Sequence, residues 1–321
     1  MTSDPTALAA PLHTPAWTVG GVTVHRIDEV ELPPQTGPWL LPRATPDVVA
    51  EFPWLQPDFA GSDRMLRLAS HTFAIEADGL RILVDTGIGN GKERANPAWH
   101  RLRTDYLDRL ERAGFSPETV DVVILTHLHT DHVGWNTRSH AGTWVPTFPN
   151  ARYLVSRTEW DHWASVDMDG PRQQMFRDSV HPVADHGLLD LVEVPAGGLV
   201  AAPGVTLVPV PGHTPGQVAV RLDSRGSSAL ITGDCIHHPV QLAAPGIHSH
   251  VDIDPARAEA TRRDLLSDLA GTDTLLLGSH FPPPTAGLVR AHGAAYRLHP
   301  VPARPGRPRA TATPTGGQAP A

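Results

Sequence analysis

Short apolar runs, many of them β-branched, recur along the chain, and several are followed by a turn and then by a histidine or an aspartate. Runs of this length and composition predict β-strands. The predicted strands are 17–27, with a turn at Gly20 and Gly21, then 71–75, 80–85, 122–125, 153–155, 205–209, 217–222, 228–231 and, as the last strand, 274–277. Ala77, Asp78 and Gly79 predict a hairpin turn between the second and third of these runs.

Other segments place their apolar residues at helical spacing. Residues 97–114 predict a helix that ends at Gly114, and 157–164 and 171–180 predict two more. Asp254 followed by Pro255 predicts the start of a helix that runs to about Gly271, because Asp is a favoured N-cap and Pro is favoured at the first helical position. Strands interleaved with helices indicate an α/β fold.

Four segments depart from these patterns. Residues 1–15 are predicted to be a flexible N-terminus, and 301–321, rich in Pro, Arg, Ala, Thr and Gly, a disordered tail. Between them, 16–300 is predicted to form one domain. Within it, 30–65 is a proline-rich arm with scattered aromatic residues, and 135–182 is an aromatic-rich insertion expected beside a pocket.

Composition narrows the class of protein. The chain has 321 residues and a formal net charge of −8, and its 26 Lys and Arg residues form no basic block, which argues against a nucleic-acid partner. Cys235 is the only cysteine, so no intrachain disulfide forms, and we expect it to be buried in the core. No signal peptide and no apolar run of about 20 residues is visible. We therefore expect a cytoplasmic protein with no membrane segment.

The candidate chemistry is concentrated in the stretch T-H-L-H-T-D-H-V-G at 126–134. His127, His129, Asp131 and His132 directly follow the predicted strand 122–125. On a helix, residues two apart point to different sides, whereas on an irregular turn all four side chains can converge. Three imidazoles and one carboxylate at this spacing indicate a metal site.

Four other predicted strands also run into a potential ligand. They lead to Asp85, His213, Asp234 and His280. Chemistry in sheet proteins gathers beyond the strand ends, where the scaffold is rigid and the loops are free to vary. Seven of these groups suffice for two divalent metal ions with open positions for water and substrate. The mixture of imidazole and carboxylate suits Zn²⁺ and also admits Mn²⁺ or Fe²⁺.

The set H-x-H-x-D-H, G-H-T-P-G, T-G-D and a late G-S-H resembles the metallo-β-lactamase superfamily. The resemblance implies a four-layer αβ/βα sandwich with a binuclear site at one edge. It assigns His127, His129 and His213 to one metal, Asp131, His132 and His280 to the other, Asp234 as the bridge between them, and Asp85 to orienting the site.

The same resemblance implies a metal-dependent hydrolase whose nucleophile is a metal-bridging hydroxide, with Asp131 able to pass a proton to the leaving group. The run from Asp234 to Gln241 is similar to the branch that holds methyl parathion hydrolase and N-acyl homoserine lactonases. A lactone, a carboxylic ester or an organophosphate ester is the expected small-molecule substrate. A thioester hydrolase of glyoxalase II type and a non-hydrolytic metal-binding or redox relative are the alternatives.

Expectations for the substrate pocket rest on weaker signals. Trp160 and Trp163 are three residues apart on a predicted helix, so they pack in the core or form an apolar pocket wall. His237 and His238 follow Asp234 closely and are candidate pocket residues. If the tryptophans line the pocket, the substrate has an apolar part. The arm at 30–65 resembles a segment often used in dimerisation, which suggests a homodimer.

Overall fold

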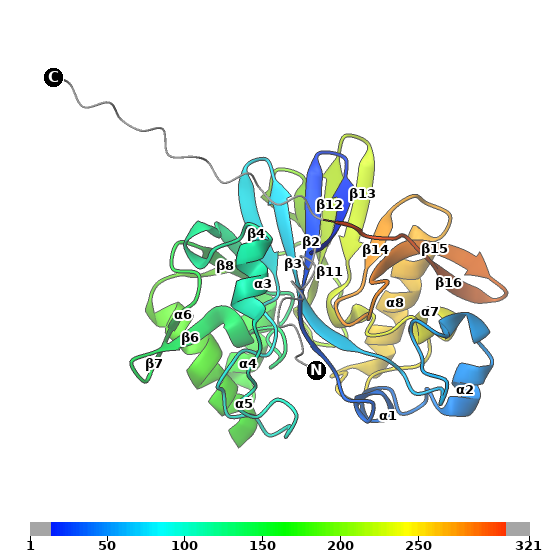
Figure 1. Ribbon diagram of the computed structural model, residues 1–321, viewed down its shortest axis with the longest axis horizontal. Helices are drawn as coiled ribbons and strands as arrows, with labels where there is room; N and C mark the ends of the chain where they lie inside the picture. The colour runs from blue at the N-terminus through cyan, green and yellow to red at the C-terminus, as the bar shows by residue number, and fades with distance from the viewer. Residues whose placement is uncertain (1–13, 306–321) are drawn as a thin grey trace, which may run out of the picture.

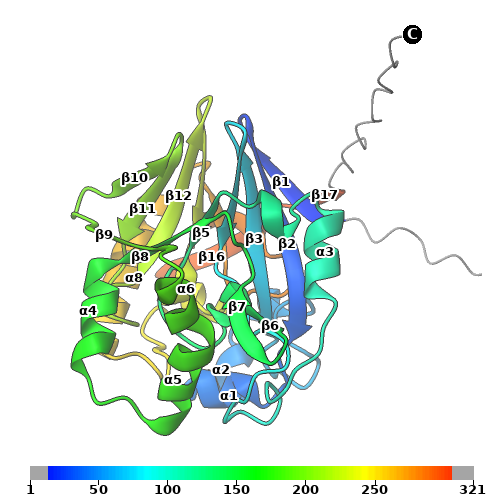
Figure 2. The ribbon, with the colours of Figure 1, turned by 90° about the vertical axis from the view of Figure 1, so that its left-hand side faces the viewer.

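The computed structural model describes residues 14–305, which form two facing β-sheets with helices on both outer sides (Figures 1 and 2). The first sheet has the strand order β17-β1-β2-β3-β4-β5-β8-β9. Its strands are β1 (Pro15–Val19), β2 (Val22–Glu31), β3 (Ala69–Ala77), β4 (Leu80–Val84), β5 (Val122–Ile124), β8 (Arg152–Ser156), β9 (Leu189–Val192) and β17 (Arg304–Pro305). The strands β4, β5, β8 and β9 are parallel, and the remaining pairs are antiparallel.

The second sheet runs in sequence order from β10 to β16. Its strands are β10 (Leu199–Ala202), β11 (Val205–Pro209), β12 (Val218–Ser224), β13 (Ser227–Ile231), β14 (Leu275–Leu277), β15 (Ala286–His292) and β16 (Ala295–Pro300). A separate hairpin pairs β6 (Thr137–His140) with β7 (Thr143–Pro146). The predicted hairpin at 71–85 is present, and the predicted strands 217–222 and 228–231 also pair as a hairpin.

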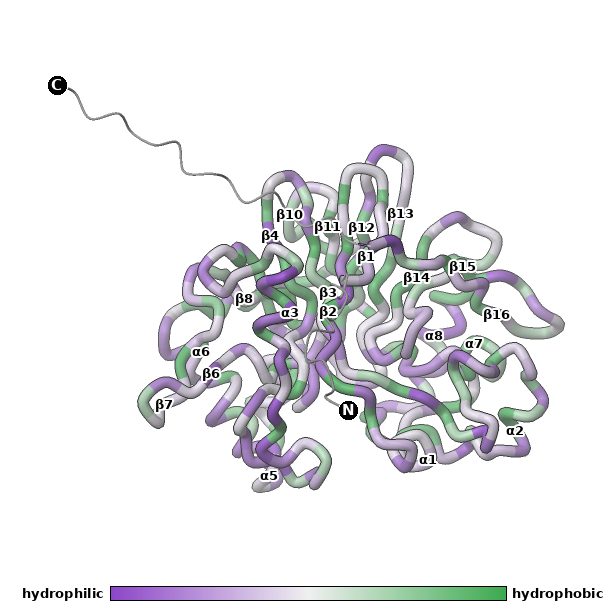
Figure 3. The backbone as a smooth tube through the Cα atoms, in the orientation of Figure 1, coloured by the Kyte–Doolittle hydropathy of each residue, from purple (hydrophilic) through white to green (hydrophobic). Residues whose placement is uncertain are grey.

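Alternating side chains on the strands define the layers. In β4, Ile82 and Val84 pack between the two sheets, whereas Leu83 points to the helices outside the first sheet. In the second sheet, Leu230 and Leu276 point outward in the same way while their neighbours fill the space between the sheets. Because both faces of each sheet are covered, the short central strands β5 and β14 are wholly apolar. Figure 3 shows hydrophobic stretches along other strands of the sheets as well.

Helices cover both outer faces. Beside the first sheet lie α3 (Tyr106–Arg112), α4 (Arg157–Ser165), α5 (Gly170–Met175), a π-helical turn at Phe176–Val180 and α6 (His181–Asp185). Beside the second lie α1 (Thr36–Leu40), α2 (Pro46–Ala50), α7 (Val240–Ala243) and α8 (Pro255–Leu269). Short 3₁₀ turns occupy Pro53–Leu55, Pro117–Thr119, Gly134–Asn136 and Gly233–Cys235. The arrangement is the predicted four-layer αβ/βα sandwich.

The helix predicted over 97–114 is much shorter in the structure, where only Tyr106–Arg112 is helical. Arg101 has a φ of 52°, in the left-handed region that a right-handed helix excludes. The side chain of Asn96 accepts a hydrogen bond from the Ala98 amide and so stabilises a turn instead. The start of α8 agrees with the prediction, because the Asp254 carboxylate accepts a hydrogen bond from the Arg257 amide.

Several predicted boundaries also differ. Strands β15 and β16 follow the segment predicted to be the last strand. Arg304–Pro305, placed in the predicted tail, pairs with Pro15 and Ala16. Pro15 itself belongs to β1, although 1–15 was predicted to be flexible; residues 1–13 and 306–321 lie outside the described part of the chain. The segment 135–182 is not a simple insertion, because it contributes β8 to the first sheet.

The arm at 30–65 folds back against its own domain. Leu40, Leu55 and Phe59 are buried in the same core as α8 and the second sheet. The Leu40 carbonyl accepts a hydrogen bond from the His250 amide, at 2.8 Å. This packing brings α1 beside the loops that follow β13. Among residues 14–305, no helix combines the length and apolar character that crossing a membrane requires.

A buried ionic cluster holds the loop after β4 against the 135–182 segment. Lys92, the only lysine in the chain, is fully buried, with its ammonium 3.6 Å from an Asp178 carboxylate oxygen and 3.8 Å from the centre of the Trp144 ring. Arg94 forms two hydrogen bonds with the same carboxylate, of 2.7 and 2.9 Å. Burial lowers the pKa of Lys92 to about 7, although Asp178 opposes this shift.

The free energy of unfolding is expected to rise between pH 7 and pH 8.5 because of Lys92. Over this range the unfolded chain keeps a proton on the lysine, whose ordinary pKa is 10.5, while the folded chain releases it at about pH 7. Stability rises with pH wherever the unfolded state binds more protons. Lys92→Met should therefore weaken the dependence of the free energy of unfolding on pH, which urea unfolding at a series of pH values measures. The control Arg101→Gln removes an exposed partner of Glu93 and should keep the full pH dependence. An unchanged pH dependence in Lys92→Met would show that Lys92 is not its source.

Candidate metal centre

The site begins at the ends of the neighbouring strands β4 and β5. Parallel pairing sets Val84 beside Ile124, so that Asp85 and Thr126 emerge at the same sheet edge. Asp85 has a φ of 57°, and its carboxylate accepts hydrogen bonds from the amide and the hydroxyl of Thr126, each 2.8 Å long. These bonds fix the backbone where the histidine cluster starts.

The Asp85 carboxylate also orients one of the predicted ligands. Its Oδ2 lies 2.8 Å from His132 Nδ1, so the other ring nitrogen, Nε2, points into the site. A carboxylate behind an imidazole fixes its tautomer and orientation, which is the usual support for a metal-binding histidine. Asp85 therefore lies where the orienting aspartate was expected.

A second carboxylate supports His213 in the same way. Asp252 Oδ1 lies 2.8 Å from His213 Nδ1, and both side chains are buried. Burial alone raises the pKa of Asp252, but His213 and His237 outweigh it and hold that pKa below its usual value. Gly212, just before His213, has a φ of 136°, and a Cβ there would lie 2.2 Å from the Ala258 amide nitrogen. The chain reaches His213 in this position only with glycine before it.

Glu159 of α4 joins the two loops that carry the ligands. This carboxylate is fully buried. It accepts hydrogen bonds from the amides of Leu128 and Gly216, at 3.0 and 3.2 Å, and from the Trp163 indole at 2.7 Å. Leu128 lies between His127 and His129, and Gly216 follows His213. A single side chain thus sets the distance between the two histidine loops.

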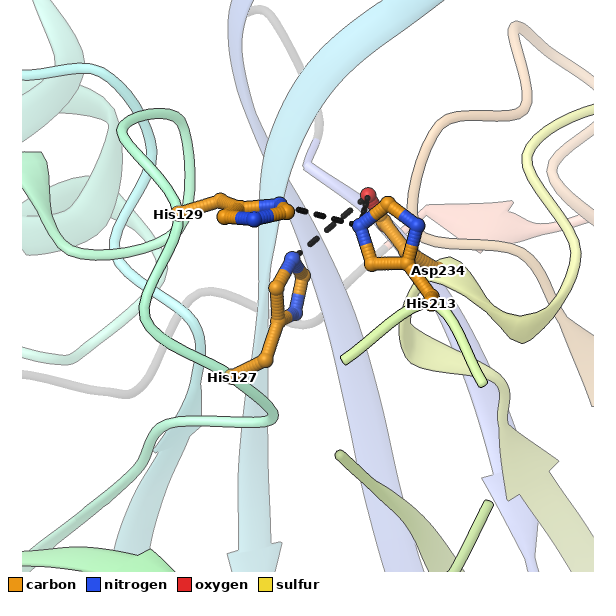
Figure 4. A group of neighbouring side chains, drawn as sticks. All are labelled: His127, His129, His213 and Asp234. Atoms are coloured by element: carbon orange, nitrogen blue, oxygen red, sulfur yellow. Dashed lines mark hydrogen bonds and ion pairs between the residues drawn. The ribbon is translucent and has the colours of Figure 1, made fainter. Parts of the chain in front are cut away.

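The first ligand group is formed by His127, His129, His213 and Asp234 (Figure 4). Their candidate ligand atoms all lie within 4.8 Å of one another. His213 Nε2 lies 2.9 Å from His129 Nδ1. Asp234 Oδ2 is 3.3 Å from His213 Nε2 and 3.7 Å from His127 Nε2. Figure 4 shows the three rings and the carboxylate pointing at one another, with His127 and His129 on the same loop and His213 and Asp234 on other segments.

The second group is formed by Asp131, His132 and His280. His132 Nε2 and His280 Nε2 are 3.2 Å apart, and Asp131 Oδ2 is 3.6 Å from His280 Nε2. The other carboxylate oxygen of Asp234, Oδ1, faces this group, 3.3 Å from His132 and 3.1 Å from His280. Asp234 therefore presents one oxygen to each group.

The donor set fits two divalent ions. Two nitrogens on one tetrahedral Zn²⁺, each about 2.0–2.1 Å from the metal, are about 3.3 Å apart, close to the observed nitrogen–nitrogen distances of 2.9 and 3.2 Å. His127 Nε2 is buried, yet it has no hydrogen-bond partner among residues 14–305. An orphaned nitrogen aimed into a cluster of carboxylates and imidazoles is the arrangement expected of a metal ligand.

Burial and neighbouring charges shift the pKa values of the residues in the two ligand groups. Burial lowers the pKa of His127 and His129 well below the ordinary value. Burial acts on His132 in the same direction, but the carboxylates of Asp234, Asp85 and Asp131 outweigh it and raise the His132 pKa well above that value. Burial raises the pKa of Asp234, but the surrounding imidazoles overcome this and lower it well below its usual range. The Asp234 carboxylate is thus held in its ionised form, which is the form that binds cations.

The predicted pocket residues lie in different places. His237 lines a cavity of about 150 Å³ at the ligands, and its Nε2 is 3.2 Å from Asp234 Oδ2. His238 does not line it: its ring is buried and bonds to the Phe59 carbonyl, so that it fixes the arm. Trp160 and Trp163 do not line it either, and Trp163 packs behind His129 with ring centres 5.7 Å apart. Cys235 is buried, and burial raises its pKa to about 12.

The aromatic walls come instead from Trp39 in the arm and Trp99 in the loop before α3. Asp252 and Glu159, which position the ligands, also escaped the sequence prediction. Asp252 follows no strand directly, whereas Glu159 lies in the first turn of α4, just after β8, and each contacts residues that are distant in the chain. A possible signal for Glu159 was its spacing of four residues from Trp163, which puts an acidic side chain on the apolar face of a predicted helix.

The model of the metallo-beta-lactamase superfamily matches residues 66–280, which include every ligand described above. The chain belongs to this superfamily. The resemblance inferred from the strand-end motifs is therefore confirmed, and so is the fold.

Similar proteins include metallo-hydrolases and lactonases. A probable metallo-hydrolase of Mycobacterium tuberculosis is 27% identical over 54% of this chain and 58% of its own length. The N-acyl homoserine lactonase AiiA of Bacillus thuringiensis subsp. kurstaki is 26% identical over 53% of this chain and 65% of its own. The chain spans about three fifths of the length of these curated relatives.

Two solved structures share the fold along nearly the whole chain. AidC, a dizinc quorum-quenching lactonase, superposes with a TM-score of 0.71 at 22% identity and covers 90% of this chain and 97% of its own. The hydrolase AbOPH superposes with a TM-score of 0.73 at 22% identity and covers 91% and 99%.

Metal analysis of the purified protein is expected to give about two divalent ions per chain, because the two ligand groups each suit one ion. Asp234→Asn should lower this number, since the bridge loses its charge. Plasma mass spectrometry after dialysis measures the content. Clearly less than one ion per chain in the unaltered protein, after incubation with Zn²⁺ or Mn²⁺, would rule out a binuclear centre.

Asp252→Asn should weaken metal binding by about 10- to 100-fold, the usual effect of removing a carboxylate that orients a metal-binding histidine. Competition with a chelating zinc indicator measures the affinity. The matched control is Asp223→Asn, because Asp223 is an exposed carboxylate that bonds only to Arg221 and Ser228 among the described residues. Equal affinities for the two variants would show that Asp252 does not support the site.

Proposed function

We propose that the chain is a two-metal hydrolase of lactones and carboxylic esters, with organophosphate esters as the other class within reach of the same site. The observation that carries the proposal is the position of Asp234. Its two oxygens face two separate groups of ligands, on the wall of a cavity. Bound divalent ions, most readily Zn²⁺, lower the pKa of a coordinated water and polarise the ester carbonyl.

The residues of the chain prepare this reaction in three ways. His127, His129 and His213 would hold one ion, and the imidazoles of His132 and His280 would hold the other. The buried carboxylates behind them keep the rings oriented, so little reorganisation is needed during the reaction. Leu32, Leu40, Trp39, Trp99 and Val251 line the cavity. These apolar walls exclude bulk water and favour a substrate with an apolar part.

Asp131 is placed to handle the proton. It lines the cavity at the second ligand group and is partly exposed, unlike Asp234. Its Oδ2 lies 3.6 Å from His280 Nε2. In the proposed reaction this carboxylate would hold the second ion, take the proton that the attacking water gives up, and pass that proton to the leaving oxygen when the ester bond breaks. The names of the similar proteins, which include lactonases, support the choice of substrate class.

A substrate panel tests the proposal. It contains an acyl homoserine lactone, an aryl ester, an aryl phosphotriester and a glutathione thioester, each assayed with added Zn²⁺ or Mn²⁺. Hydrolysis of the lactone or the aryl ester is expected to exceed that of the thioester. Activity should vanish after chelation and return with metal. Dominant thioester hydrolysis would favour an enzyme of glyoxalase II type, and no hydrolysis of any compound by metal-loaded protein would refute the proposal.

Asp131→Asn is expected to lower kcat by about 100-fold or more, the usual contribution of a proton-transfer group. Metal content is measured in parallel, so that loss of proton transfer is separated from loss of the second ion. Asp223→Asn is the control and should retain full activity. If Asp131→Asn kept both its metals and its kcat, Asp131 would have no part in moving the proton.

A further inference from the structure

The cavity at the metal ligands opens into a larger chamber. The inner cavity has a volume of about 150 Å³ and the outer chamber about 550 Å³. They share the lining residues Thr36, Trp39, Trp99, Thr130, Arg172 and Val251. A substrate whose reacting bond lies at the ligands therefore extends the rest of its body into the outer chamber. The chamber lies between α1 and α5, which Figures 1 and 2 show at the same end of the molecule.

The charge of the outer chamber is opposite to that of the protein. The chain has a formal net charge of −8, yet the residues that line this chamber include two arginines and no carboxylate. The aspartates are confined to the inner cavity. The remaining wall is largely apolar, with Trp39, Trp99, Ala95 and Ala98. The chamber thus combines apolar surface with positive charge.

The two arginines differ in their availability. Arg94 donates a hydrogen bond from each terminal nitrogen to the buried carboxylate of Asp178. Among residues 14–305, the Arg172 guanidinium has no carboxylate within 4.0 Å and makes no side-chain hydrogen bond. The carboxylates of Asp169 and Glu159 lie beyond that distance and act on its charge without bonding to it, so its donors are free. Its guanidinium carbon lies 4.0 Å from the centre of the Trp163 ring. A guanidinium stacked on an indole is held flat, with its edge free to bind a planar anion.

The stacking also fixes the distance of Arg172 from the reaction. Trp163 is buried, and its indole nitrogen is bonded to Glu159, so the platform under the guanidinium is rigid. The ring of His129 packs against the same indole, with the two ring centres 5.7 Å apart. Arg172 lines both cavities, one aromatic ring away from a metal ligand.

We propose that the outer chamber is a subsite for a carboxylate on the part of the substrate that is not hydrolysed, and that Arg172 binds it. The inference rests on the proposed hydrolysis for the reacting bond. A planar guanidinium edge matches a carboxylate through two parallel hydrogen bonds. A single free cation balances one negative charge, which favours a monocarboxylate over a dianionic phosphate. The preferred substrate is an ester or lactone with an apolar body that ends in a carboxylate.

Two esters of equal chain length test the subsite. The 4-nitrophenyl monoester of adipic acid carries a free carboxylate, and 4-nitrophenyl hexanoate ends in a methyl group. Arg172→Gln should raise KM for the adipate monoester by about 10- to 100-fold, the usual loss when a hydrogen bond between two charged groups is removed. KM for the hexanoate should change by less than about twofold. Arg172→Lys keeps the positive charge but lacks the planar edge. Its KM for the adipate monoester should therefore lie between those of the unaltered protein and of Arg172→Gln.

The matched control is Arg177→Gln. Arg177 is an exposed arginine five residues further along, bonded to Gln174, and it does not line the chamber. It should leave both KM values unchanged. Thermal unfolding of each variant verifies that the fold is intact. If Arg172→Gln affects the two esters equally, or affects neither, the subsite is refuted while the hydrolysis proposal stands.

A binding measurement separates this inference from the proposed function. Calorimetry on metal-loaded protein compares 4-phenylbutanoate with its neutral amide. The carboxylate is expected to bind about 10-fold or more tightly than the amide, and Arg172→Gln should abolish the difference. If no compound of the substrate panel is hydrolysed but this difference is found, the subsite stands and the proposed function fails. An affinity for 4-phenylbutanoate that is unaffected by Arg172→Gln would place the carboxylate elsewhere, including at the metals, and overturn the inference.

Discussion

The Asp234 carboxylate is the constraint that the rest of the site must satisfy. It is buried among imidazoles from both ligand groups, with one oxygen toward each. A buried carboxylate is costly unless cations or hydrogen bonds compensate it. The positive partners must therefore arrive from several strand ends at once. The sandwich meets this demand because the loops that follow β5, β11, β13 and β14 all emerge at the same edge.

Convergence at one edge does not by itself orient the rings. Each half of the site has a buried carboxylate for this purpose, Asp85 behind His132 and Asp252 behind His213. Asp252 is in turn near the guanidinium of Arg262, which bonds to the carbonyls of Cys235 and Ile247. Glu159 spans the two loops from α4. The ligands are thus connected through polar contacts to helices on both sides of the sandwich, which makes their positions rigid.

Most of the candidate metal centre could be predicted from the sequence, because each candidate ligand follows a strand and a strand is a local pattern. The fold was predictable for the same reason, through alternating apolar runs and the capping residues of α8. Of the supporting carboxylates, Asp85 was predictable because it also follows a strand, but Asp252 and Glu159 were not. Asp252 and Glu159 act through contacts with residues more than 30 positions away. The helical spacing of Trp160 and Trp163 admits either core packing or a pocket wall, and in the structure both pack in or against the core. Trp39 and Trp99, which do line the cavity, come from segments without any period.

This division between predictable and unpredictable parts follows from how the two regions are built. The ligands depend on sheet registry, which tolerates little change without loss of the core. The chamber depends on the arm, the loop before α3 and the short helix α5, each held by a few specific contacts. The Lys92, Arg94 and Asp178 cluster holds one wall, and the bond from His238 to the Phe59 carbonyl holds the arm behind another. Substitutions in these contacts change the shape and charge of the chamber while the strand ends stay in place. Specificity can therefore vary on this scaffold independently of the metal centre.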